Sequence, residues 1–230
     1  NWKRHGEMDK FHHKLVDGML ARGYEAEFAE RLYRQILGFG EYGFPESHSA
    51  SFAVLTYASA WLKYHYPAAF YCAILNSQPM GFYSASQLVQ DARRHGVEVL
   101  PVCINHSVWD HSLEATETAE LALRLGLRQV KGVRQDHIQR LLKHRPKQGF
   151  KDLPQVQSLH LAKGQLESLA SANALTCFSG HRYQARWQLL DNHQDLPLLR
   201  EVRETNPDQL PGPAALDALT EDYASLHLSL

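Results

Sequence analysis

Basic side chains gather in one window of the sequence, between residues 124 and 151. The nine cations of this window are Arg124, Arg128, Lys131, Arg134, Arg140, Lys143, Arg145, Lys147 and Lys151. Asp136 is the one acidic residue among them, although the whole chain has a net charge of −1 from 24 basic and 25 acidic residues. Charge that is segregated in this way predicts an anionic partner at one face of the protein.

The chemistry expected within this window is phosphate binding by a glycine turn. The run Val130-Lys131-Gly132-Val133 precedes an expected helix, Gln135–His144. An apolar-x-Gly-apolar turn at a helix start exposes backbone N–H groups, which together with the positive end of the helix dipole can hold a phosphate without reading bases. This pattern is typical of a helix-hairpin-helix motif, and Leu161–Leu175 followed by Gly180-His181-Arg182 forms its weaker second unit. The residues predicted to bind DNA are Lys131, Gly132, Val133, Arg134, Arg128, Lys143, Arg145, His181 and Arg182. The alternative is a solvated basic helix behind a glycine turn.

A second candidate site is the glycine- and aromatic-rich stretch 38–53, in which we expect a loop over 38–48. Ser47, His48 and Tyr42, with two nearby phenylalanines, could stack on or hydrogen-bond to a nucleotide or a template strand. The alternative is that the aromatic rings pack beneath the following helix, with Ser47 as its N-cap and His48 in its first turn.

Metal chemistry is not expected in this chain. The 14 histidines form no closed zinc spacing, since His12 and His13 point about 100° apart on a helix and His106 and His111 stand five residues apart. We therefore expect surface histidines. Metal-dependent nucleotidyl transfer needs converging aspartates, and the sequence has no Asp-x-Asp, no Walker loop and no Gly-x-Ser-x-Gly elbow.

The elements that would position these residues are mostly helical. Apolar periodicity and caps predict helices at 7–20, 24–37, 49–65, 67–76 and 85–95, with a break at Gly23, a cap at Ser84 and a mostly buried third helix. Short strands are expected at Val97–Ile104, Val108–Glu114 and Leu121–Leu127, the first two joined by a turn at 105–107. The pattern is helical again from Val130 to Leu190, and 201–218 is predicted to be a linker. The predicted fold is mainly α with a small antiparallel β-hairpin or sheet.

Composition sets outer limits on these expectations. At 44% hydrophobic residues, the 230-residue chain has enough apolar content for a sizeable core. Its three cysteines, Cys72, Cys103 and Cys177, are odd in number and far apart, which fits a reducing cytoplasm. The sequence shows no signal peptide and no apolar run of bilayer length. Because it starts without methionine and reads from Thr220 like the opening of another element, we expect a piece of a larger protein.

Several separate segments resemble one family in order and spacing. Five segments resemble the fingers of bacterial C-family DNA polymerases, the alpha subunits of DNA polymerase III: Leu15–Leu20, 39–53, 60–63, 66–70 and 75–77. Two later segments, Val130–Arg145 and Gly180–Trp187, resemble the tandem helix-hairpin-helix segment that follows the fingers in those enzymes. The error-prone branch of that family is the one that three segments resemble in detail: Phe44–His48, Asn76–Tyr83 and Gln90–Gly96. Glu46 departs from the replicative branch, which usually has lysine there, and this weakens any phosphate-binding role at that position.

The resemblance implies a DNA polymerase that extends past lesions, with Mg²⁺ at palm-domain aspartates that precede this segment in the family. The chain itself would then hold no catalytic residue. It also implies the segments 1–96 (helical fingers), 97–127 (small β element), 128–190 (tandem helix-hairpin-helix), 191–219 (clamp-binding peptide and linker) and 220–230 (start of the next domain). Gln194-Asp195-Leu196-Pro197-Leu198-Leu199 resembles the short peptide by which bacterial polymerases hold the sliding clamp.

The partners implied by the resemblance are duplex DNA, the sliding clamp and mutagenesis accessory proteins that include a Y-family-like adaptor, without a membrane. The competing hypothesis is a non-catalytic structural module that links the palm to the clamp and touches little DNA.

Overall fold

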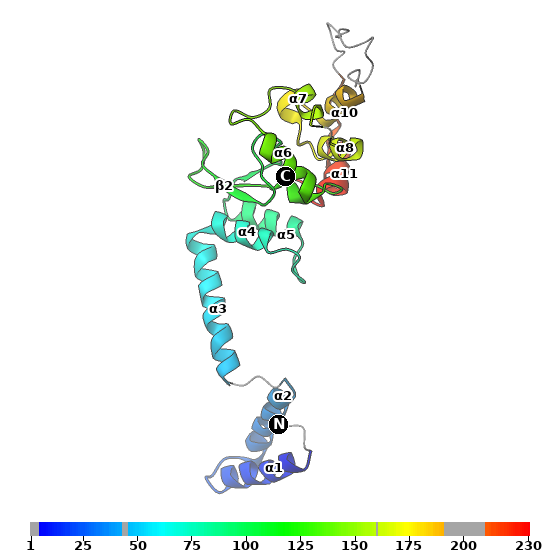
Figure 1. The fold of residues 1–230 in the computed structure, drawn as a ribbon. Coiled ribbons are helices and arrows are strands. Elements are labelled where there is room, and N and C mark those ends of the chain that lie inside the picture. The colour runs from blue at the N-terminus through cyan, green and yellow to red at the C-terminus, as the bar shows by residue number, and fades with distance from the viewer. Residues whose placement is uncertain (1–4, 43–45, 160, 191–209) are drawn as a thin grey trace, which may run out of the picture. The chain divides into compact units, whose positions relative to one another are not determined.

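The computed structural model describes residues 5–42, 46–159, 161–190 and 210–230 of the chain. Backbone contacts divide the chain into two compact units, Asn1–Ala60 and Trp61–Leu230. The predicted class, mainly α with a small sheet, is confirmed (Figure 1). The five segment boundaries stay predictions, although the structure groups the chain differently. Within the described residues, no helix combines the length and the apolarity that a bilayer crossing requires.

The first unit is a pair of packed helices, α1 (His5–Leu20) and α2 (Ala26–Tyr42), followed by most of α3 (Glu46–His65). Val16 of α1 and the pair Ala29 and Tyr33 of α2 are buried between them. The predicted break at Gly23 is confirmed, and its positive φ of 85° explains the glycine.

The loop predicted at 38–48 is wrong for most of its length. Helix α2 continues to Tyr42 and α3 begins at Glu46, so that Ser47 and His48 fall in the first turn of α3 rather than before it. A glycine inside a helix costs about 1 kcal/mol relative to alanine, which tertiary context readily outweighs. The high glycine content of this stretch therefore led to a predicted loop that is longer than the one observed.

The prediction that α3 is mostly buried is also wrong for this chain by itself. Phe52, Leu55 and Trp61 are 53%, 60% and 44% exposed, and apolar residues face solvent on every side of the described part of the helix. Periodicity reveals which residues are apolar, but the neighbour that covers them has to come from elsewhere in the structure.

In the second unit, helices α4 (Pro67–Asn76) and α5 (Ala85–Arg94) pack against each other and against a small sheet (Figure 1). Pro67 occupies the first turn of α4, where no N–H is needed. The cap predicted at Ser84 is confirmed: its Oγ accepts from the Gln87 N–H at 3.2 Å, and the Gln87 side chain accepts from the Ser84 N–H at 3.0 Å. This capping box fixes where α5 begins.

The sheet has three short strands in the order β1-β3-β2 and is mixed rather than antiparallel throughout. Its strands are β1 (Val99–Leu100), β2 (Ser112–Glu114) and β3 (Ala122–Arg124). β1 runs parallel to β3, and β2 runs antiparallel to it. The predicted hairpin between the first two strands is wrong because β3 lies between them, and residues 101–111 form a loop that side chains hold in place.

His111 in this loop corrects the expectation of surface histidines. The His111 side chain is buried, and its Nδ1 accepts from the Gly126 N–H at 3.1 Å. The backbone N–H of His111 donates to Asn76 Oδ1 at 2.8 Å. Burial, aided by the nearby Arg128 charge, lowers the pKa of His111 to about 4. The ring is therefore neutral near pH 7 and serves the fold.

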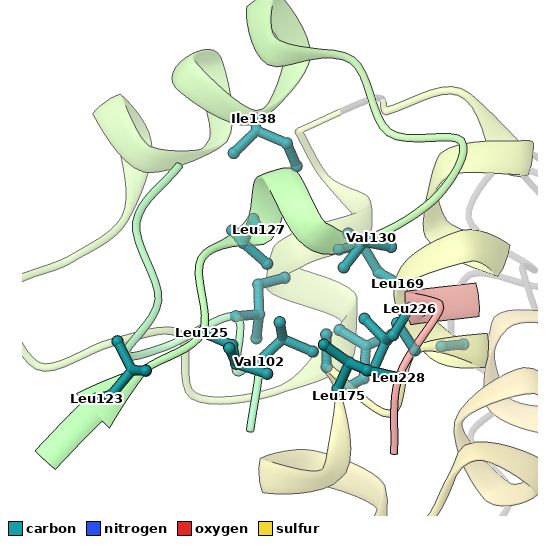
Figure 2. Packing of buried hydrophobic residues seen from close by; sticks show 14 of the residues in the cluster. Val102, Leu123, Leu125, Leu127, Val130, Ile138, Leu169, Leu175, Leu226 and Leu228 are labelled. Carbon is teal, nitrogen blue, oxygen red and sulfur yellow. The ribbon is translucent and has the colours of Figure 1, made fainter. Parts of the chain in front are cut away.

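The remaining helices enclose one core together with the sheet. They are η1 (Leu127–Gln129), α6 (Gln135–His144), α7 (Leu153–Gln157), α8 (Lys163–Ser171), α9 (Thr176–Ser179), α10 (Arg182–Leu190) and α11 (Ala215–Leu226). Figure 2 shows Val130, Leu169 and Leu175 close to Leu226 and Leu228 of the C-terminal end, with Leu123 of β3 and Ile138 of α6 farther out in the same buried cluster. The linker predicted over 201–218 is wrong from Ala215 onward, because α11 begins there and belongs to this core.

Candidate nucleic-acid interface

The turn before α6 has the local structure expected for a phosphate-binding hairpin. Val130 is buried and Val133 half-buried, while Lys131, Gly132 and Arg134 are exposed. Gly132 has a φ of 88°, and a Cβ at this position would stand 2.7 Å from Ser168 Oγ of α8. Glycine is thus favoured by the backbone conformation, and a larger residue would also have to displace the Ser168 hydroxyl group.

The amide groups of this turn are only partly free. The Lys131 N–H donates to the Ser225 carbonyl oxygen of α11 at 2.8 Å, so it is not available to a ligand. The amides at the start of α6 precede the first intrahelical bond, which runs from the Ile138 N–H to the Arg134 carbonyl oxygen. Arg134 is the N-cap and makes no side-chain capping bond. The amides at the helix start, rather than that of Lys131, are therefore the ones that a phosphate could use.

Helix α6 is amphipathic and presents its charged face to solvent. Ile138 and Leu141 are buried, whereas Arg140 and Lys143 are exposed. Arg134 pairs with Asp136 at 3.0 Å, but both side chains are more than half exposed. Such an exposed pair contributes little, so Arg134 can exchange its partner for a phosphate.

Six of the nine cations in the basic window are exposed, and the other three bind the protein itself. The exposed ones are Lys131, Arg134, Arg140, Lys143, Lys147 and Lys151. Arg124 pairs with Glu114. Arg128 donates to the carbonyl oxygens of Asn76 and Gln78 at 3.0 and 3.2 Å and to Asp110 at 2.8 Å.

Arg145 is the third of these inward-facing cations. Its Nη1 donates to the Ile104 and Ser107 carbonyl oxygens at 3.0 and 2.7 Å. Both Arg128 and Arg145 were predicted to bind DNA, which stays a prediction; in the structure Arg128 binds the end of α4 and Arg145 binds the loop after β1. A guanidinium has five donors in a fixed fork and suits clustered carbonyl oxygens as well as a phosphate, so residue type alone did not separate the two uses.

The second predicted hairpin is covered by the C-terminal part of the chain. Gly180 has a φ of 76° and ends α9. His181 Nε2 lies 3.0 Å from the Leu210 carbonyl oxygen. Arg182 is 3% exposed and pairs with Asp222 and, at 3.5 Å, with Glu221. The charge of Arg182 is thus paired inside the fold, and its contact with a phosphate stays a prediction.

Sequence reasoning missed the acidic residues of α11 that pair with the arginines of α10. Arg186 Nη1 pairs with Glu221 at 2.8 Å, and its Nη2 donates to Ser171 Oγ at 2.7 Å. The only sequence signal for these ion pairs was the spacing of the charges: two arginines one helical turn apart and two adjacent acids on a later helix.

The other predicted sites receive no test from the geometry. Tyr42 ends α2, and Ser47 and His48 lie in the first turn of α3, but their side chains are outside the described set. The peptide Gln194–Leu199 lies outside the described residues altogether. Among the residues that are described, no three His, Cys, Asp or Glu side chains are placed to hold a metal ion together.

A basic helix behind a glycine turn, packed on further short helices, is the pattern expected of a helix-hairpin-helix region, and the sequence model of a family described as "Helix-hairpin-helix motif" matches residues 96–185. The curated relatives are more specific. Over 100% of its length the chain is 54% identical to an error-prone DNA polymerase of Vibrio parahaemolyticus and 49% identical to one of Pseudomonas aeruginosa. Over 98% of its length it is 51% identical to one of Hahella chejuensis.

The chain therefore belongs to the error-prone DNA polymerase family, as the resemblance predicted. It spans 22% of the length of each of these three relatives.

Proposed function

We propose that the chain is a non-catalytic segment of an error-prone polymerase that extends DNA past lesions, and that its first hairpin holds duplex DNA through the phosphate backbone. The observation that carries this proposal is the exposed glycine turn at Gly132. It lies directly before a helix whose solvent face is cationic. Amides at a helix start and flexible cations contact phosphates without reading bases. Such a grip suits a polymerase, which must hold any sequence that it copies.

The sharpest test is a charge reversal at the turn. In the full-length protein, Lys131→Glu combined with Arg134→Glu is expected to weaken duplex binding at least tenfold, equally for two duplexes of unrelated sequence. Losing two phosphate contacts should also reduce the slope of log affinity against log salt by about 2. Fluorescence anisotropy titrations at several salt concentrations measure both quantities.

The matched control changes the same charge elsewhere. Arg93 and Arg94 are exposed at the end of α5, so Arg93→Glu with Arg94→Glu alters the net charge equally without touching the turn. If both double variants lose affinity to the same extent, the effect is general repulsion and the hairpin proposal fails.

A structural module with little DNA contact remains the second candidate. Two observations favour it: the Lys131 N–H is used by Ser225, and the second hairpin is covered by residues 210–222. If the chain is such a structural module, the charge reversal at the turn would leave both the affinity for duplex DNA and its dependence on salt unchanged. The same titrations therefore separate the two candidates.

The finer roles follow from the family and are part of the proposal. Tyr42, Ser47 and His48 would lie on the nucleotide or template side of the fingers. As the family resemblance implies, Mg²⁺-dependent chemistry would lie at aspartates in the palm of the parent polymerase. The accessory partners would be mutagenesis proteins that include a Y-family-like adaptor, in the cytoplasm.

The clamp tether is proposed from the sequence 194–199. Leucines that fill an apolar cleft and a glutamine amide at its rim would give about micromolar affinity, or roughly −8 kcal/mol, which acts by raising local concentration. Gln194→Ala with Leu198→Ala is expected to abolish retention of the polymerase on clamp-loaded DNA in a pull-down. Glu201→Gln with Arg203→Gln, in the same segment, should leave it intact, and unchanged retention of the first variant would remove this claim.

A further inference from the structure

Two of the three cysteines, 74 positions apart in sequence, meet in the second unit. Cys103 lies in the loop after β1, and Cys177 is the second residue of α9. The side chain of each cysteine is the largest influence on the pKa of the other, so the two thiols are neighbours. Two further contacts hold the segments together: the Ile104 N–H donates to the Ala174 carbonyl oxygen at 2.9 Å, and Asn105 Nδ2 lies 3.7 Å from Cys177 Sγ.

The surroundings of the pair favour a thiolate that a small oxidant can reach. Cys103 is buried and Cys177 is exposed, so the pair opens to solvent on one side. The neighbouring Cys177 side chain, together with the backbone at Asn105 and His106, lowers the pKa of Cys103 to about 5 despite its burial. The Cys103 side chain and burial both raise the pKa of Cys177. Cys103 is therefore the thiolate of the pair at neutral pH.

Cys72 provides an internal contrast. It is buried, burial raises the pKa of its thiol, and its Sγ donates to the His111 carbonyl oxygen at 3.4 Å. Because the thiolate is the nucleophile, Cys72 should be inert where the pair is reactive.

We propose that Cys103 and Cys177 form a redox-active dithiol that closes to an intramolecular disulfide when hydrogen peroxide is present. The Cys103 thiolate attacks one peroxide oxygen, an S–O bond forms and the O–O bond breaks. The departing hydroxide takes a proton and leaves as water, and Cys103 becomes a sulfenic acid. Cys177 sulfur then attacks Cys103 sulfur, so that an S–S bond forms, the S–O bond breaks and a second water carries away the Cys177 proton. Each disulfide consumes one peroxide, and a dithiol reductant reverses the change.

Closure must bring the two sulfur atoms to the S–S bond length of about 2.05 Å. Cys177 itself is exposed, and no residue of its four-residue helix α9 is buried. The bond would fasten the loop after β1 to the turn that leads into α10, next to the covered second hairpin. Disulfides in cytosolic proteins are usually transient and redox-sensing, which fits a reversible device of this kind.

The test is peptide mapping of the full-length protein after brief exposure to stoichiometric peroxide. We expect a cross-linked peptide pair that contains residues 103 and 177, with a loss of about 2 Da, while Cys72 is recovered as a free thiol after unfolding and alkylation. Closing a loop of about 75 residues should also raise the Tm of the second unit by about 5 °C or more, and dithiothreitol should reverse this shift.

The single variants distinguish this reaction from general oxidation. Cys177→Ser should stop Cys103 at the sulfenic acid, which dimedone traps, and Cys72→Ser should leave the cross-link unchanged. Free Cys103 and Cys177 after peroxide treatment, or oxidation of Cys72 at the same rate, would overturn the proposal. So would a cross-link that forms only between molecules.

Discussion

Gly126→Ala is expected to lower the free energy of unfolding of the unit Trp61–Leu230 by about 3 kcal/mol or more. The reason is close backbone approach. A Cβ at this position would stand 2.5 Å from the Trp109 carbonyl oxygen and closer still to the Asp110 carbonyl group. The φ of Gly126 is −80°, so strain in the left-handed region plays no part. Overpacking of a well-packed site usually costs about 1–3 kcal/mol, and the larger figure applies where the neighbours cannot move.

The neighbours of Gly126 are fixed on both sides. The Leu127 N–H donates to the Val108 carbonyl oxygen at 2.8 Å, and the Arg128 N–H donates to that of Trp109 at 3.0 Å. The Gly126 N–H itself binds the buried ring of His111. An added methyl group would therefore have to break backbone hydrogen bonds rather than displace a flexible side chain.

Denaturant unfolding followed by circular dichroism measures this effect, and Gly164→Ala provides its control. Gly164 lies exposed in the first turn of α8, and a Cβ there would meet nothing within 4 Å. Alanine at this site should be neutral or stabilise by up to about 1 kcal/mol, because it favours the helix. Equal destabilisation by the two changes would contradict the packing argument at Gly126.

The sequence was informative where the determinants of structure are local. The capping box at Ser84 and the glycine after the first helix each follow from residues a few positions apart. Strand pairing is different, since strands of two or three residues carry almost no periodic signal. The parallel pairing of Val99 with Leu123 depends on contacts 24 residues apart in sequence, so the mixed sheet could not be derived.

The same distinction separates the cations of the predicted site. Lys131 and Arg145 are equally basic members of one sequence window, yet the first is exposed and the second binds the carbonyl oxygens of Ile104 and Ser107. What decides between the two roles is an acceptor about 40 residues away. The charge pattern predicted a basic surface, and it could not identify the members that serve the fold.

Arg182→Ala should be the most destabilising single change of charge in the described part of the second unit, at about 3–5 kcal/mol. Arg182 is 3% exposed, and its partners Asp222 and Glu221 have side chains 19% and 25% exposed. Removing one member of such a buried pair leaves the other charges without compensation, which is far more costly than the net contribution of the pair. Ser229 Oγ also donates to Asp222 at 2.9 Å, so the loss reaches the end of the chain.

A double-mutant cycle isolates this pairing from the loss of side-chain packing. Arg182→Met keeps apolar volume and Asp222→Asn removes the opposing charge, so the double variant should be less destabilised than the sum of the two single variants by about 1–3 kcal/mol. Arg134→Ala, which breaks an ion pair more than half exposed on both sides, should cost no more than about 1 kcal/mol.

Duplex affinity completes the comparison between the two arginines. Measured below the unfolding transition, it should fall for Arg134→Ala and stay unchanged for Arg182→Met. If Arg182→Met lost duplex affinity and Arg134→Ala kept it, the ion-pair cluster of Arg182, Glu221 and Asp222 would have to open to admit the DNA backbone.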